Sequence, residues 1–151
     1  MYGQVRVYYL DHQYIIQEYC YTEGKGWFAG QIGETNTRTS TNSRIGAVQY
    51  GGVHVRVYYQ RENYLSSNAI HLLKHREEAG SQAIKELCHD GLNWYEGALC
   101  LPGAFGGTSI AAVVCHLDGQ LRVYYQTEDL SLREHCHDSK GWWPGQFVST
   151  L

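Results

Sequence analysis

The stretch Val55-Arg56-Val57-Tyr58-Tyr59 decides the fold, because the chain contains it three times with little change. The other two copies are Val5-Arg6-Val7-Tyr8-Tyr9 and Leu121-Arg122-Val123-Tyr124-Tyr125. In a strand, the Arg and the first Tyr of each copy share one face, and the small aliphatic residue between them shares the other face with the second Tyr. Such self-similarity indicates a repeat architecture built from short strands.

Two further motifs follow each copy in the same order. A Glu two residues before a Cys comes first, and a Trp-aromatic-x-Gly segment closes the unit. The Glu-containing runs are Gln17–Cys20, Lys85–Cys88 and Arg133–Cys136, and the closing runs are Trp27–Gly30, Trp94–Gly97 and Trp142–Gly145. Three motifs repeated three times in one order indicate three copies of a single structural unit.

The spacing of the motifs gives the size of the unit. The Arg precedes the Glu by 12 residues in the first and third units and by 30 in the second. The second unit therefore carries an insert of about 18 residues, at about 64–83. Without it the repeat is about 48 residues, which suits one four-stranded blade of a β-propeller. Within the insert, Ser67 and Asn68 favour the start of a short helix over Ala69–Ala79.

The chain is thus predicted to be all-β, a single arc of about three propeller blades over residues 1–151. The blades are expected at 1–43, 44–107 and 108–151, with linkers at 36–43 and 102–107. The apolar runs Ile45–Gln49 and Ile110–Val114 supply a strand ahead of the Arg strand in the second and third units. No such run precedes Val5, so the first blade is expected to lack one strand.

Composition agrees with a globular β protein and excludes several classes. Aromatic residues make up 13% of the 151 residues and charged residues only 18%, the reverse of a disordered chain. The net charge of −3 gives no electrostatic case for nucleic acid as a partner. No apolar run is long enough for a membrane-spanning helix, so no membrane insertion is expected. Because no secretory signal is visible, a cytoplasmic location or a non-classical route to the cell surface is expected.

The five cysteines favour free thiols over a metal site or a disulfide framework. Cys20, Cys88 and Cys136 occupy equivalent positions in different units, and no Cys-x-x-Cys pair occurs. Equivalent positions lie a blade apart, too far for one zinc ion. Neither a metal nor another cofactor is therefore expected.

Together, the Arg-Val-Tyr-Tyr, Glu-x-Cys and Trp-aromatic-x-Gly motifs resemble those of the fungal fucose-specific lectins of the Aleuria aurantia type. The resemblance covers essentially the whole chain except the insert. It implies a six-bladed propeller that binds L-fucose between adjacent blades without metal. Six blades of this size need about 288 residues, so the chain resembles half of such a propeller, and a homodimer is expected to close it.

In that family each pocket takes an Arg and a Glu from one blade and a Trp from the next. Residue by residue, the resemblance implies fucose-binding roles for Arg6, Glu18, Trp27, Arg56, Glu86, Trp94, Arg122, Glu134 and Trp142. Trp94 would complete the first pocket and Trp142 the second. The third pocket would need a Trp from outside the arc, such as Trp27 of a second copy.

The chemistry of these residue types suits a small neutral sugar. An Arg fork donates to hydroxyls, a carboxylate accepts from them, and Trp offers a flat apolar surface with one N–H. The expected function is a multivalent lectin for fucosylated glycans, with no catalysis. Three alternatives stay open at this stage: a protein-interaction propeller, a non-functional partial gene product and a glycosidase. The repeated tyrosines and Phe28, Tyr95 and Trp143 are expected to be packing residues.

Overall fold

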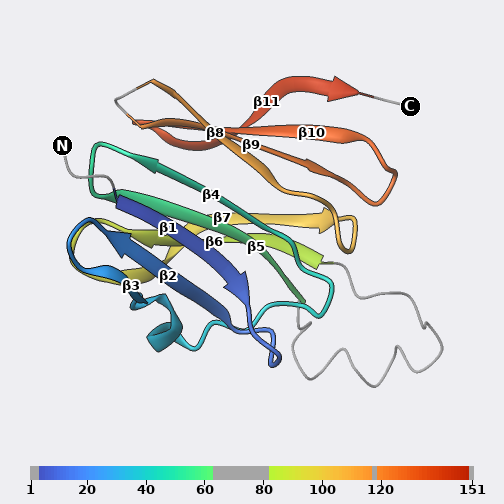
Figure 1. The fold of residues 1–151 in the computed structure, drawn as a ribbon. Coiled ribbons are helices and arrows are strands. Elements are labelled where there is room, and N and C mark those ends of the chain that lie inside the picture. Colours follow the sequence, from blue (N-terminus) through green and yellow to red (C-terminus); the bar gives the residue numbers. More distant parts are fainter. Residues whose placement is uncertain (1–3, 63–81, 117–118, 150–151) are drawn as a thin grey trace.

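The computed structural model describes residues 4–62, 82–116 and 119–149, which form three antiparallel sheets that follow one another along the chain (Figure 1). Blade 1 comprises β1 (Gln4–Leu10), β2 (Ile16–Thr22) and β3 (Gly26–Ala29), followed by a 3-10 turn, η1 (Ile32–Thr35). Blade 2 comprises β4 (Ile45–Tyr50), β5 (His54–Glu62), β6 (Gln82–His89) and β7 (Trp94–Ala104). Blade 3 comprises β8 (Ala111–His116), β9 (Gln120–Gln126), β10 (Leu132–Asp138) and β11 (Gly141–Ser149). The predicted all-β fold with four-stranded blades and a three-stranded first blade is confirmed.

Strand register is the same in all three blades around the repeated motifs. The Arg of each central strand lies opposite the Cys of the next strand, and the first Tyr lies opposite the Glu. Each Trp of the closing motif lies opposite the residue that follows this Cys. The three Arg–Cys pairs are Arg6–Cys20, Arg56–Cys88 and Arg122–Cys136. Equivalent residues can therefore be compared position by position from here on.

The hydrophobic core lies between the blades. One cluster joins blades 1 and 2 and contains Ile16, Val57 and Tyr59. A second joins blades 2 and 3 and contains Tyr58, Ile84 and Val123. Both faces of blade 2 are buried in this way, because alternate residues of one strand point to opposite sides of the sheet. Both seams between the described blades are thus filled by an apolar core.

Two predicted boundaries differ from the structure. Residues 102–104 belong to β7, so only part of the expected 102–107 linker connects the blades. Residues 82 and 83, expected in the insert, belong to β6 instead. The β5–β6 ladder extends two pairs beyond Gln60 and Ile84, to Glu62 and Gln82, and this extra pairing uses the residues that flank the insert. The helix predicted at 69–79 lies outside the described residues.

The cysteines are all free, and three of them, Cys20, Cys88 and Cys136, are buried. Burial raises the pKa of each of these thiols, that of Cys88 to about 12. Across the part of the chain that the structure describes, no helix is long and apolar enough to span a membrane.

Candidate functional site

The first candidate site centres on a short ion pair within blade 1. Arg6 Nη1 lies 2.7 Å from Glu18 Oε1, and the Tyr8 hydroxyl donates to the same oxygen at 2.9 Å. Burial acts to lower the pKa of Arg6, but the Glu18 hydrogen bond and charge outweigh it and hold that pKa above its usual value. Burial and the Glu18 charge also raise the pKa of Tyr8 far above its usual range. Arg6 is therefore held as a cation and Tyr8 as a neutral phenol.

A cavity of about 400 Å³ opens beside this pair, at the seam between blades 1 and 2. Blade 1 contributes Arg6, Glu18 and Phe28 to its lining, and blade 2 contributes His89 and Trp94. The Trp94 ring meets the Tyr8 ring edge-on, with centroids 6.1 Å apart, and also contacts His89. The structure thus brings together the three residues that the sequence assigned to the first pocket.

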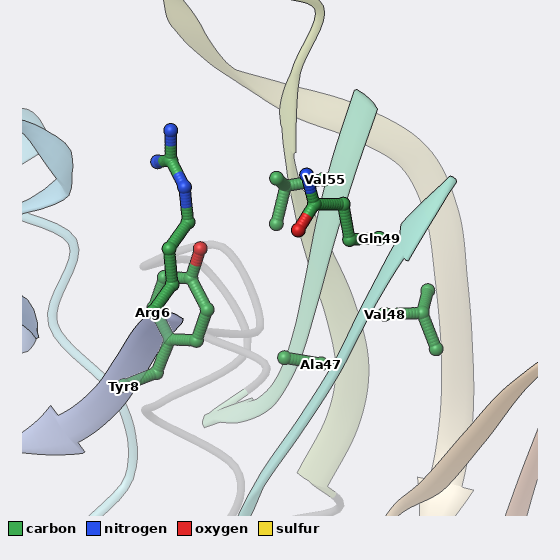
Figure 2. A pocket seen from close by; sticks show the side chains of 6 residues that line it. All are labelled: Arg6, Tyr8, Ala47, Val48, Gln49 and Val55. Carbon is green, nitrogen blue, oxygen red and sulfur yellow. The ribbon is translucent and has the colours of Figure 1, made fainter. Parts of the chain in front are cut away.

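Arg6 also borders a smaller cavity of about 150 Å³ on the other side, between β1 and β4 (Figure 2). Figure 2 shows the side chains of Arg6 and Tyr8 on one wall and those of Gln49 and Val55 on the other. Blades 2 and 3 each have a strand ahead of the strand equivalent to β1, and blade 1 has no such strand among the described residues. Arg6 therefore stands between the two cavities.

The second candidate site lies at the seam between blades 2 and 3. It has the same residue types as the first site in a different arrangement. Trp142 of blade 3 donates its indole N–H to Glu86 Oε1 at 3.1 Å, and the Leu99 amide donates to the same oxygen at 3.0 Å. Among the described residues, Glu86 Oε2 and the Tyr58 hydroxyl are buried without a hydrogen-bond partner. Arg56 turns away, with Nη1 donating to the Val55 carbonyl at 3.1 Å. The predicted Glu86–Trp142 pair is in contact, whereas Arg56 makes no ion pair with Glu86 within the described chain.

The third candidate site has its Arg and Glu but lacks a following blade. Tyr124 donates to Glu134 Oε1 at 2.8 Å, and Arg122 Nε lies 3.8 Å from that oxygen. The hydrogen bond from Tyr124 is the main cause that holds the pKa of Glu134 below its usual value. The Arg122 guanidinium also lies 5.6 Å from the centre of the Trp143 ring. No tryptophan of an adjacent blade covers this pair in the described structure.

Trp27 stands at the same register position as Trp94 and Trp142, although it follows its Glu by nine residues rather than eight. The additional residue is accommodated in the turn between β2 and β3, where Gly24 and Gly26 have φ values of 81° and 78°. Trp27 packs on Tyr21 and is 57% exposed. Because Trp27 belongs to the first described blade, no preceding described blade of this chain offers it an Arg–Glu pair.

A scan against protein-family models matches residues 2–150 to the fungal fucose-specific lectins. The chain belongs to this family. A fucose-specific lectin from Aleuria aurantia is 35% identical over 97% of this chain and 42% of its own length. The crystal structure of the Aleuria lectin, described as a six-bladed β-propeller with a novel fucose recognition mode, matches with a TM-score of 0.80 and 33% identity. That match covers 98% of this chain and 43% of the solved one.

The chain therefore spans less than half the length of these relatives and is a partial propeller. A variant of the Aleuria lectin has been solved in complex with alpha-methyl-L-fucoside, with a TM-score of 0.79, 32% identity, and coverage of 98% of this chain and 43% of that one. A fucose lectin from Kordia zhangzhouensis shares the fold alone, at 19% identity and a TM-score of 0.62. Its match covers 98% of this chain and 93% of that chain, so a solved chain of nearly this length has the same arrangement.

Sequence reasoning missed a role for the glycine that closes each repeated unit of this chain. A Cβ added to Gly30, Gly97 or Gly145 would overlap the carboxylate of the Glu in the same blade. The equivalent glycines therefore leave the space that each carboxylate occupies. Their fixed spacing after the Trp was the available signal, because a glycine repeated in every unit indicates close approach by another group.

Several aromatic residues expected to be packing residues have a further role or are exposed, although Tyr8 packs on Trp94 and Tyr124 on Phe147. Tyr8 and Tyr124 hold the Glu carboxylates through their hydroxyls. Tyr95 and Trp143 are exposed, because their strands lie at the outer edge of the sheets, and Phe28 lines the first cavity. The second Tyr of the repeat does pack in blades 2 and 3, where Tyr59 and Tyr125 are buried.

The site chemistry comes from hydrogen bonding and apolar contact. Within the described ranges, no group of three His, Cys, Asp or Glu side chains is placed to hold a metal ion. The first cavity offers a cation, a carboxylate and a flat aromatic wall in one space, which suits a small polyhydroxylated ligand with one apolar side.

Proposed function

We propose that this chain is a lectin that binds L-fucose in fucosylated glycans at the seams between blades, without catalysis. The observation that carries the proposal is the cavity at the first seam, where Arg6 and Glu18 of blade 1 face Trp94 of blade 2. Family membership supports it, as does the fucoside complex of the related Aleuria lectin.

The residues match the two sides of the sugar. L-Fucose carries ring hydroxyls on one edge and a methyl group where most hexoses carry a hydroxymethyl. In the proposed complex, Arg6 donates to neighbouring hydroxyls, Glu18 accepts from one, and Trp94 covers the apolar side. Because Glu18 already holds Arg6 at 2.7 Å, the polar side is organised before the sugar enters.

Fucose binding is tested by calorimetry with methyl α-L-fucoside, and methyl α-L-galactoside serves as the matched ligand because it adds only the 6-hydroxyl. We expect heat with the fucoside, weaker binding of the galactoside and fewer sites in Arg6→Ala. Arg133→Ala is the matched control, because Arg133 pairs at 3.9 Å with the exposed Asp129 at a hairpin. An absence of heat at millimolar fucoside would refute the proposal.

The lining of the cavity argues against a glycosidase. Such enzymes use two carboxyl groups about 5–10 Å apart. Among the described residues that line the first cavity, Glu18 is the single carboxylate, and it accepts hydrogen bonds from Arg6 and Tyr8. Release of nitrophenol from 4-nitrophenyl α-L-fucoside would overturn the non-catalytic assignment.

Multivalency follows from the repeats. Each chain carries three Arg–Glu sets, and we propose that it acts as a homodimer, which doubles that number. Several weak sites on one particle bind a glycan-coated surface far more tightly than one site does. The proposed partners are therefore fucosylated glycans or glycoproteins displayed at high density.

A further inference from the structure

The first cavity is lined by two apolar side chains that do not belong to the set of Arg6, Glu18 and Trp94. Phe28 of blade 1 and Leu92 of blade 2 both line this cavity of about 400 Å³. Leu92 is 79% exposed, the highest value among the large apolar residues of the described chain. An exposed leucine alone needs no explanation, but one that lines the cavity of a candidate binding site is available to a ligand there.

Leu92 stands in the turn between β6 and β7, and the structure holds this turn in one shape. The Leu92 amide donates to Asp90 Oδ1 at 3.2 Å, and the Gly91 amide donates to His89 Nδ1 at 3.1 Å. Gly91 has a φ of 103°, and a Cβ added to it would lie 3.3 Å from the Cβ of Val53 in the β4–β5 turn. The two turns of blade 2 therefore brace each other, and the place of Leu92 is set before a ligand enters.

Phe28 is held on the other wall of the same cavity. It lies opposite Cys20 in the β2–β3 ladder, and Arg6 lies opposite Cys20 in the β1–β2 ladder, so Phe28 and Arg6 share one face of blade 1. Lys25 Nζ lies 3.6 Å from the centre of the Phe28 ring, a cation–π contact that restrains the ring. With Leu92 on blade 2, apolar groups thus line the cavity from both sides of the seam.

The equivalent positions at the second seam carry polar groups. Lys140 precedes its Trp by two residues as Leu92 does, and its amide donates to Asp138 Oδ1 at 2.7 Å in the same kind of turn. Tyr95 is the register equivalent of Phe28, because each lies opposite the Cys of its own blade. Of these two seams, the first is therefore the one in which both positions are hydrocarbon.

We infer that the first seam binds fucosides whose anomeric oxygen carries an apolar group, with that group packed between Phe28 and Leu92. A glycosidic fucose is joined to its carrier through this oxygen, so the ligand continues from the sugar at that point. A cavity of about 400 Å³ is in the range of sites that hold ligands larger than one monosaccharide. The inference rests on the proposed function for the sugar itself and adds the class of aglycone.

Calorimetry with phenyl α-L-fucoside and methyl α-L-fucoside tests the inference. The phenyl group has apolar area to bury against the two side chains and the methyl group has little, so we expect the phenyl fucoside to bind roughly fivefold more tightly. Leu92→Lys installs the residue of the second seam and is expected to remove most of this preference. Leu130→Lys is the matched control, because it makes the same change at an exposed leucine between β9 and β10 of blade 3 and should keep the preference.

NMR of the Leu92 methyl groups reports the contact directly. We expect the ring current of the phenyl fucoside to shift these signals upfield, and the methyl fucoside to shift them much less. Equal affinities for the two fucosides, a preference that survives Leu92→Lys, or Leu92 methyl signals that respond alike to both ligands would overturn the inference while leaving the lectin in place. An absence of heat with both fucosides would refute the proposed function and this inference with it.

Discussion

Trp142 of blade 3 donates its indole N–H to the carboxylate of Glu86 in blade 2, at 3.1 Å. The bond crosses the seam between two blades and ends on a carboxylate that is only 3% exposed. Trp94 stands at the equivalent position over Glu18, but no hydrogen bond between these two residues occurs in the described structure. In the second site the Trp and the Glu are thus joined by a hydrogen bond across the seam, whereas the equivalent Trp and Glu of the first site are not.

Replacing Trp142 with Phe should destabilise the protein more than replacing Trp94 with Phe. Both changes remove the same part of an aromatic ring, but only the first removes a hydrogen bond to a buried carboxylate. Such a bond contributes about 1.5–3 kcal/mol, so we expect a difference of that order in the free energy of unfolding. Urea unfolding of the two variants measures it, and equal losses would show that the Trp142–Glu86 bond adds no stability.

Gly97→Ala should be markedly destabilising because the new methyl group would overlap Glu86. Overpacking of this kind costs about 1–3 kcal/mol where the neighbour cannot move. Gly145→Ala creates the same overlap with Glu134, whose side chain is 15% exposed and can rotate outward. We therefore expect a smaller loss for Gly145→Ala. A melting temperature lowered equally in both variants would contradict this view of the glycines.

Removing the Tyr124 hydroxyl should raise the pKa of Glu134. The Tyr124 hydrogen bond is the main cause of its lowered value, so Tyr124→Phe is expected to shift the Glu134 titration upward. A carboxyl with a lowered pKa stabilises the fold above its unfolded value, near 4.5, and this stabilisation is lost as pH falls through the folded value. The variant should lose that part of its stability at a higher pH than the wild type.

The measurement is a carboxyl-carbon NMR titration of Glu134 in the wild type and in Tyr124→Phe. Tyr125→Phe is the matched control, because Tyr125 is buried on the opposite side of the same strand. An unchanged Glu134 titration in Tyr124→Phe would show that the hydrogen bond is absent in solution.

Thiol reactivity should divide the cysteines into two groups. Cys20, Cys88 and Cys136 are buried and have raised pKa values, so they are expected to react slowly with a disulfide reagent. Cys100 and Cys115 are exposed. Two fast equivalents in the native protein and five in denaturant are expected. Rapid reaction of Cys88, identified by mass spectrometry, would show that blade 2 opens readily.

Much of the fold follows from the repeats, because each motif fixes a strand and the order of the motifs fixes the order of strands. The grouping of Arg6 and Glu18 with Trp94 was implied by the resemblance to the fucose-specific lectins. The different courses of the three arginines did not follow, because their sequence surroundings match. Arg6 donates to Glu18, whereas Arg56 and Arg122 each donate to the carbonyl of the preceding residue. The roles of Gly30 and Tyr8 were missed for another reason. Both residues lie against the Glu18 side chain, and motif spacing does not say in which direction that side chain points.

The extended β5–β6 ladder has a consequence for the use of this protein as a reagent. Its last pair, Glu62 and Gln82, lies four residues along the strand from Glu86, a separation of about 13 Å at the usual rise per residue. The ladder therefore ends well away from the Glu86 carboxylate, which lies between blades 2 and 3. A fluorophore, biotin or surface tether attached to the chain where this ladder ends would therefore be joined to the sheet about 13 Å along the strand from Glu86.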